Sequence, residues 1–243
     1  MKTIASHLKP GSRITVLTGA GVSAASGIPT FRGADGLWQN FRPESLATAE
    51  AFRRDPRLVW EWYDWRRQVI ATKQPNRAHD LLAKWSRRFP GFTLITQNVD
   101  GLHERAGTDN VVRFHGSIWE VSCWDQCKSS PARWRNDLAP LPQIPPECPH
   151  CGGLIRPGVV WFGEGIDPEV AQRSLEAMNC EVFFTIGTSS LVYPAAGLLA
   201  EAKARNAFTV EMNLERTPAS HLVDVAIQGK ADELLVELED LLL

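Results

Sequence analysis

The stretch that decides the fold is residues 14–33, which read ITVLTGAGVSAASGIPTFRG. It begins as an apolar, β-branched segment typical of a buried strand and then breaks into the pattern Gly19-x-Gly21-x-x-Ala24. Glycines at this spacing permit a tight turn and let backbone N–H groups approach a pyrophosphate at the N-terminus of a helix. Short glycine-rich turns also join strands to helices without a ligand, so the residues that follow must decide the function.

The segment after the turn departs from that of a nicotinamide dehydrogenase. Such an enzyme continues into a second strand and an acidic residue about 20 positions on, which binds the ribose 2′-OH. Here the chain is interrupted at Gly27, Pro29, Gly33 and Gly36, which is too often for a regular element. Glu44 lies at the right distance, but its neighbours have no strand pattern. We therefore expect a loop that covers a bound nucleotide, and the pattern argues against a dehydrogenase.

Length and charge exclude several classes of protein. A chain of 243 residues can bury a full core, and its formal net charge of −2 gives no electrostatic argument for binding nucleic acid or an anionic membrane. No apolar run approaches the roughly 20 residues of a membrane-spanning helix, and the first residues lack the apolar core of a secretory signal. We expect a cytoplasmic, soluble protein with no direct nucleic-acid or membrane partner.

Strand-like and helical patterns alternate along the chain. Nearly continuous apolar runs, typical of parallel strands covered on both faces, occur at 13–17, 92–96, 111–114, 182–186, 208–212 and 224–227. Helical periodicity fits residues 56–72, 76–88, 168–178, 194–205 and 231–242. This alternation predicts an α/β fold with a Rossmann-like, doubly wound parallel sheet.

Two stretches do not fit the alternation, residues 36–75 and 119–158. We expect them to form a smaller helical and zinc-binding module. That module would be inserted into a Rossmann-like, nucleotide-binding domain made of residues 1–35, 76–118 and 159–243.

Four of the five cysteines lie in the second of these stretches. They form two close pairs, Cys123 with Cys127 and Cys148 with Cys151, separated by 20 residues. Two pairs at such a separation are typical of a structural zinc site, because each pair supplies two thiolates to a tetrahedral ion. Four thiolates leave no open position, so the predicted Zn²⁺ is structural and not catalytic. Cys180 lies apart from them and is expected to be a small buried residue.

Polar residues follow two of the predicted strands. Gln97, Asn98 and Asp100 come directly after one strand, and His115 comes after the next. Ligands of open α/β sheets bind beyond the carboxyl ends of the strands, so both segments are expected to meet the ligand of the glycine turn. Histidine is the natural general base at neutral pH, although Asn98 and Asp100 could also serve only as helix caps.

These motifs together resemble the sirtuins, a family of NAD-dependent protein lysine deacylases. The resemblance covers residues 13 to 231, with the motifs in the order of the family. It is carried by the cysteine pairs and by residues 19–33, 96–103, 114–116, 159–164, 187–189, 213–215 and 229–231.

The resemblance implies that NAD is a co-substrate that is cleaved. In the family, the acyl-lysine oxygen attacks the nicotinamide ribose as nicotinamide leaves, and the products are free lysine and O-acyl-ADP-ribose. His115 would be the catalytic general base, with Asn98 and Asp100 positioning the nicotinamide ribose and amide. The implied NAD-binding residues are Gly19, Ala20, Gly21, Ser23, Phe31, Arg32, Trp38, Gln97, Asn98, Asp100, Gly187, Thr188, Ser189, Asn213, Glu215 and Ala231.

The substrates implied by the resemblance are proteins that carry acylated lysines. An extended segment would bind the substrate peptide as an added strand, and its residues are Val159, Val160, Trp161, Phe162, Gly163 and Glu164.

Tyr63 and Arg66 resemble the element of the sirtuin class that accepts acidic acyl groups. Residues three apart share a helix face, so a phenol and a guanidinium can converge on one carboxylate. In an arbitrary helix, Tyr63 would instead be a core residue and Arg66 a surface residue. Within this resemblance we expect succinyl- and malonyl-lysine as substrates, with acetyl-lysine also accepted.

Two other functions use the same motifs. Protein mono-ADP-ribosyl transfer shares the departure of nicotinamide, and a non-catalytic NAD-sensing protein would need only the binding residues. The presence of His115, Asn98 and Asp100 together favours an enzyme over a sensor. A monomer is expected.

Overall fold

The six strand-like runs form one parallel sheet in the computed structural model, which describes residues 1–31, 36 and 42–242. In spatial order the strands are β3 (Val111–Arg113), β2 (Gly91–Thr96), β1 (Arg13–Thr18), β7 (Val182–Ile186), β8 (Phe208–Asn213) and β9 (Val225–Gln228). Every neighbouring pair is parallel. The order reverses between β1 and β7, and ligands of doubly wound sheets bind at such a reversal. The predicted fold class is confirmed.

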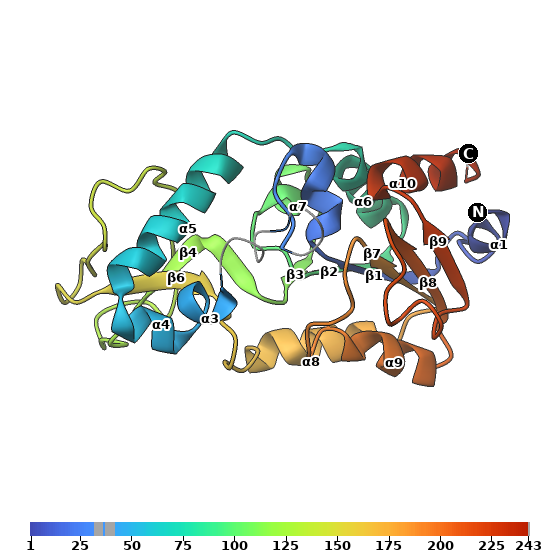
Figure 1. Ribbon diagram of the computed structural model, residues 1–243. Helices are drawn as coiled ribbons and strands as arrows, with labels where there is room; N and C mark the ends of the chain where they lie inside the picture. The colour runs from blue at the N-terminus through green and yellow to red at the C-terminus, as the bar shows by residue number, and fades with distance from the viewer. Residues whose placement is uncertain (32–35, 37–41, 243) are drawn as a thin grey trace.

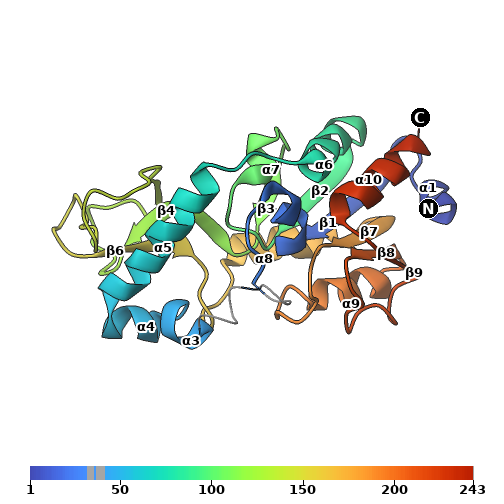
Figure 2. The same ribbon diagram turned by 45° about the horizontal axis from the view of Figure 1, so that its top comes forward.

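Helices cover both faces of this sheet, as Figures 1 and 2 show. One face carries α6 (Arg77–Arg88), α10 (Ala231–Asp240), the short α1 (Lys2–Ala5) and the 3-10 helix η1 (Ala20–Ser26). The other face carries α8 (Pro168–Ala177) and α9 (Gly197–Ala204). Because both faces are covered, all five residues of β7 are buried, which explains the continuous apolar runs of the sequence.

A second, smaller sheet lies beside the first and is antiparallel, with the order β5-β4-β6. Its strands are β4 (Gly116–Cys123), β5 (Trp134–Arg135) and β6 (Ile155–Val159). Three helices accompany it, α3 (Pro43–Leu46), α4 (Ala49–Arg54) and α5 (Pro56–Ala71). These elements share their own apolar core, which is separate from the two cores that flank the large sheet.

The helix α5 supplies much of this core because apolar side chains recur along one of its faces. It begins where expected: Pro56 occupies its first turn, and the Asp55 carboxylate accepts a hydrogen bond from the backbone N–H of Leu58 at 2.9 Å. Trp60 and Tyr63 are then buried against the small sheet. Within the described residues, no helix has the length and apolar character needed to cross a membrane.

Candidate active site

A cavity of about 800 Å³ lies between the carboxyl ends of the large sheet and the small sheet. Its wall contains most of the residues expected to bind NAD: Gly19, Ala20, Gly21, Phe31, Gln97, Asn98, Gly187, Thr188, Ser189, Asn213, Glu215 and Ala231. It also contains His115, Tyr63, Arg66 and all of residues 159–164. Arg32 and Trp38 lie outside the described residues.

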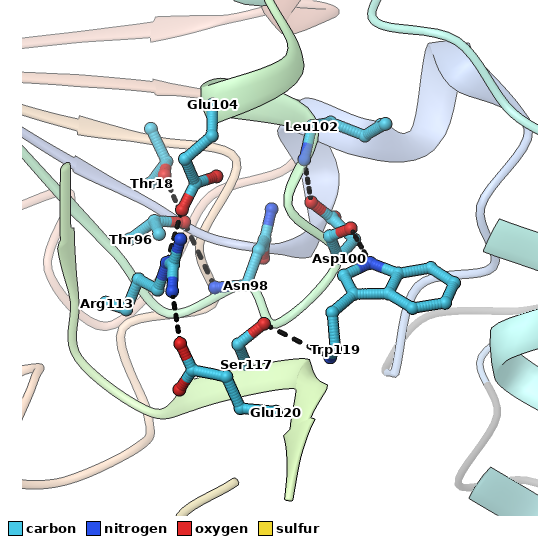
Figure 3. Close-up of polar contacts among 10 residues, drawn as sticks. All are labelled: Thr18, Thr96, Asn98, Asp100, Leu102, Glu104, Arg113, Ser117, Trp119 and Glu120. Carbon is cyan, nitrogen blue, oxygen red and sulfur yellow. Dashed lines mark hydrogen bonds and ion pairs between the residues drawn. The ribbon is translucent and has the colours of Figure 1, made fainter. Parts of the chain in front are cut away.

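Ser23 and Asp100 do not line the cavity but lie buried directly behind its wall. The Ser23 hydroxyl donates to Asp100 Oδ2 at 2.8 Å, and Asp100 Oδ1 accepts from the backbone N–H of Leu102 at 2.9 Å. The carboxylate thereby accepts from the first backbone N–H of the short helix α7 (Leu102–Arg105), whose N-cap is Gly101, as Figure 3 shows. Burial raises the pKa of Asp100.

The glycine turn is packed backbone to backbone against the turn after β7. The Gly21 N–H donates to the Gly187 carbonyl at 2.8 Å. A Cβ atom on Gly19 would lie 2.7 Å from that same oxygen, and one on Gly21 would lie 2.8 Å from Gly187 Cα. Gly187 itself has a φ of +61°. These glycines are therefore required by the contact between two turns as well as by any bound nucleotide.

Asn98 ties the segment after β2 to the glycine turn. Its Nδ2 donates to the Gly19 carbonyl at 3.0 Å and to Ser23 Oγ at 3.2 Å. Its backbone N–H donates to Thr96 Oγ1 at 3.1 Å (Figure 3). Neighbouring Gln97 donates to Thr188 Oγ1 at 2.8 Å, so the carboxyl ends of β2, β1 and β7 are held together by side chains.

His115 lies at the cavity wall in the turn between β3 and β4. Its Nδ1 is 3.3 Å from the carbonyl oxygen of Gln97. A carbonyl can only accept, so Nδ1 carries the hydrogen and Nε2 is left as the basic atom. Burial lowers the pKa of His115, which favours the neutral ring that a general base needs.

Three charged side chains, Glu104, Arg113 and Glu120, form an ionic chain (Figure 3) near the turn that contains His115. Arg113, the last residue of β3, pairs with Glu104 of α7 and donates to Glu120 of β4 at 2.7 Å. It therefore links the helix after Asp100 to both strands that flank His115. The sequence did not single out these residues, because nothing in their spacing pairs one with another.

Trp119 of β4, in the small sheet, holds the segment that follows β2 through a hydrogen bond. The Trp119 indole N–H donates to the backbone carbonyl of Asp100 at 2.7 Å (Figure 3). A Cβ on Gly101 would meet the same ring at 3.3 Å. The turn that contains Asp100 is thus shaped around this ring.

The opposite end of the cavity is formed by aromatic side chains around one cation. The Arg66 guanidinium lies 4.8 Å from the ring centroid of Trp62, 4.9 Å from that of Phe31 and 5.7 Å from that of Tyr63. Arg66 is buried, so the alternative of a surface arginine is wrong. Burial lowers the pKa of Arg66, and it raises the pKa of Tyr63. Trp62 belongs to this wall too, and only its position beside Tyr63 could have indicated it.

The segment of residues 159–164 is fixed at both of its ends. The Val160 N–H donates to the His115 carbonyl, and the Phe162 N–H donates to the Ala47 carbonyl, both at 2.9 Å. Glu164 pairs with Arg156, whose guanidinium lies over the Trp161 ring at 3.7 Å from its centroid. The segment thus borders the cavity as a held, extended edge that includes exposed Phe162.

The four clustered cysteines converge at the far end of the small sheet. Their sulfur atoms all lie within 4.8 Å of one another, with Cys123 and Cys151 at 3.7 Å and Cys127 and Cys148 at 4.0 Å. Thiolates bound to one tetrahedral zinc ion at about 2.3 Å stand about 3.8 Å apart. The cluster therefore fits a structural Zn²⁺, as predicted, and Cys180 lies buried elsewhere.

Comparison with known proteins agrees with this geometry. Residues 19–194 match the Sir2 family. An NAD-dependent protein deacylase of Aquifex aeolicus is 52% identical over 230 residues, which are 94% of this chain and 95% of that protein. NAD-dependent protein deacylase 1 of Archaeoglobus fulgidus is 46% identical over 241 residues, 98% of this chain and 94% of that protein.

Solved structures extend the comparison to bound molecules. A variant of a Sir2 homologue in complex with ADP-ribose has a TM-score of 0.92 and 42% identity, and the match covers 100% of this chain and 96% of that one. A Sir2 homologue in complex with NAD has a TM-score of 0.89 and 43% identity, covering 99% and 93% of the two chains. Sir2Tm bound to a propionylated peptide has a TM-score of 0.82 and 26% identity, covering 99% and 97%. The chain thus belongs to the Sir2 family, the sirtuins, and is an NAD-dependent protein lysine deacylase.

Proposed function

We propose that this deacylase prefers acyl groups that end in a carboxylate, succinyl and malonyl, and also removes acetyl groups. The observation that carries the proposal is the buried guanidinium of Arg66 in the cavity wall. Aromatic rings surround it, and no carboxylate of the described residues forms a direct ion pair with it; buried Asp100 acts on it only through a longer-range electrostatic attraction. A buried charge without a direct ion pair is costly, so a carboxylate on the substrate would complete the site.

The chemistry of the two side chains suits this ligand. A guanidinium presents paired N–H donors that match the two oxygens of a carboxylate, and a phenol adds a third donor. Tyr63 and Arg66 come from one face of α5 and border the same cavity. An acetyl group offers nothing to these donors, so its removal would depend only on the rest of the site.

We propose the following roles at the reacting end. NAD, held along the glycine turn and the ends of β7 and β8, supplies the ribose carbon to which the acyl oxygen becomes bonded as nicotinamide leaves. His115 Nε2 would accept the proton of a ribose hydroxyl, with the ring oriented by the Gln97 carbonyl. Asn98 would position the nicotinamide ribose. Asp100 would act through Ser23 and the start of α7, because it lies behind the wall.

We propose acyl-lysine proteins as the partners, bound along residues 159–164. The propionylated peptide named for Sir2Tm supports this class of partner. The division into a Rossmann-like domain and a smaller module, the cytoplasmic location and the monomeric state all stay predictions of the sequence.

Arg66→Met tests the acyl preference. Mass spectrometry would follow succinyl- and acetyl-lysine forms of one peptide, with and without NAD. Hydrogen bonds to a charged group contribute about 1.5–3 kcal/mol, so we expect the ratio of desuccinylation to deacetylation to fall roughly 10- to 100-fold. Arg57→Met, on the exposed face of the same helix, should leave the ratio unchanged. Equal loss of both activities in Arg66→Met would refute the preference.

A further inference from the structure

A hydrogen bond joins the end of the cavity formed by Tyr63 and Arg66, here called the acyl end, to residues 159–164, the proposed peptide-binding segment. The indole Nε1 of Trp161 donates to the hydroxyl oxygen of Tyr63 at 3.0 Å. Both side chains border the cavity, and each is only 2% exposed. The bond thus connects a residue of the segment 159–164 to a helix residue 98 positions earlier.

The direction of this bond is fixed by chemistry. An indole N–H can only donate, so the tyrosine oxygen must accept, and the phenolic hydrogen is left for another partner. Within the described part of the chain, no protein group accepts a hydrogen bond from that hydroxyl. Burial raises the pKa of Tyr63, so the hydrogen stays on the phenol at neutral pH.

Trp161 is held through both its backbone and its ring. The Trp161 backbone N–H donates to Glu164 Oε2 at 2.9 Å, and the same carboxylate oxygen accepts from Arg156 Nη2 at 2.9 Å. The Arg156 guanidinium lies over the indole at 3.7 Å from its centroid. Turning the ring away from Tyr63 would therefore break its contact with Arg156, which also pairs with Glu164 of the same segment.

We propose that Trp161 is a positioning residue for acyl selection: by occupying the acceptor side of the Tyr63 hydroxyl, it directs the phenolic hydrogen to the carboxylate of a succinyl or malonyl group. This inference rests on the acyl preference proposed above. A phenol with a fixed donor direction loses less freedom when it meets the carboxylate than one that rotates. An acetyl group has no carboxylate, so the ratio between the two activities isolates the effect.

Trp161→Phe removes the indole donor and keeps an aromatic ring. We expect kcat/KM for a succinyl-lysine peptide, divided by that for the acetyl form, to fall about fivefold, in line with one hydrogen bond. Replacement of Trp161 by 3-benzothienylalanine, which keeps the bicyclic shape without the N–H, should give the same fall if the phenylalanine variant folds poorly. Both variants can also weaken peptide binding and so lower the two activities equally. Such an equal loss cancels when one activity is divided by the other.

The chain offers a matched control in Trp60. Its indole N–H donates to the Ile155 carbonyl at 2.8 Å, and the residue is buried in the same core and on the same helix as Tyr63. It does not border the cavity. Trp60→Phe should therefore leave the ratio unchanged.

A double-mutant cycle makes the test specific to the hydroxyl. In a Tyr63→Phe background, Trp161→Phe should lower the ratio no further. Effects that multiply, or a ratio that Trp161→Phe leaves intact, would overturn the role of Trp161. If Arg66→Met lowers the ratio in the same assay, the acyl preference survives that result. If Arg66→Met leaves the ratio intact, both the preference and this role are wrong.

Discussion

The two ends of the cavity are built from different parts of the polypeptide. At the NAD end, part of the wall is backbone from Gly19, Gly21 and Gly187, packed so closely that a single Cβ would collide with main-chain atoms. At the acyl end, it consists of large side chains, Trp62, Arg66 and others, carried on a helix and on the edge of a small sheet.

This difference decides which parts of the cavity wall can be altered by substitution. The backbone part of the wall cannot be altered by substitution without moving two turns, so we expect NAD binding to tolerate little change there. A side-chain wall can be altered one group at a time while the backbone stays in place. The acyl spectrum is therefore the property of this enzyme that substitutions should reach most easily.

The largest effect should come from removing zinc, which would unfold the small-sheet side of the cavity while the large sheet stays folded. Structural zinc sites hold small modules together, with apparent binding free energies on the order of 10 kcal/mol. We expect chelation to abolish deacylation, and hydrogen exchange to lose protection across residues 119–158 while β1 and β7 keep theirs. Cys180→Ser should retain the metal. Full activity of the metal-free protein would contradict this account.

His115 lies where the two ends meet, and its loss should affect both substrates alike. We expect His115→Gln to lower kcat roughly 10²- to 10⁴-fold for succinyl and acetyl peptides. Because burial lowers the pKa of His115 and the base acts when neutral, the wild-type rate should fall only below the ordinary pKa of histidine, about 6.5. Rate profiles against pH check both points. An acid limb above that value would show that a different group is the base.

Gly187→Ala tests whether steric collision with main-chain atoms is what prevents substitution at the NAD end of the cavity. Its Cβ would lie 2.5 Å from the Val22 nitrogen, at a φ of +61°. We expect a loss of about 3 kcal/mol or more in the free energy of unfolding, together with weaker NAD binding. Gly11→Ala has a φ of +85° and no atom within 4 Å, so it should cost only about 1–2 kcal/mol. Urea unfolding and calorimetry would measure both, and similar losses in the two variants would remove the steric argument.

The smallest effect is expected for Trp119→Phe. This indole holds the Asp100 turn, which serves both substrates, so kcat/KM should fall about two- to tenfold with an unchanged succinyl-to-acetyl ratio. Trp161→Phe should instead change the ratio. If Trp119→Phe changes the ratio as well, the two ends of the cavity are not independent.

Local signals explain why so much of the fold could be predicted. The apolar run of β7 reflects burial on both faces, and Pro56 with its Asp55 cap sets the start of α5 within the chain itself. Parallel strands end at one edge of a sheet, so the position of Gln97 and Asn98 after β2 could indicate that they lie at the cavity wall.

Contacts between distant segments could not be predicted. The pairing of Arg113 with Glu104 and Glu120 depends on how α7, β3 and β4 meet in space. Likewise, Asp100 was expected in the NAD site from its position after a strand and from the resemblance, whereas its burial behind the cavity wall, bonded to the Ser23 hydroxyl, depends on how the segments pack. Arg66 was expected to meet a carboxylate, whereas its stack of aromatic neighbours became visible only in three dimensions.

The backbone hydrogen bond from Val160 to the His115 carbonyl connects the movement of residues 159–164 to the position of His115. The His115 carbonyl accepts a hydrogen bond from residues 159–164, and the His115 ring donates to the carbonyl of Gln97, which lies at the proposed NAD end of the cavity. His115, the proposed base, is thus connected to both proposed substrate sites. If residues 159–164 bind the peptide as proposed, a peptide that displaces this segment should also displace His115, which would couple the rate of proton transfer to the fit of the protein substrate.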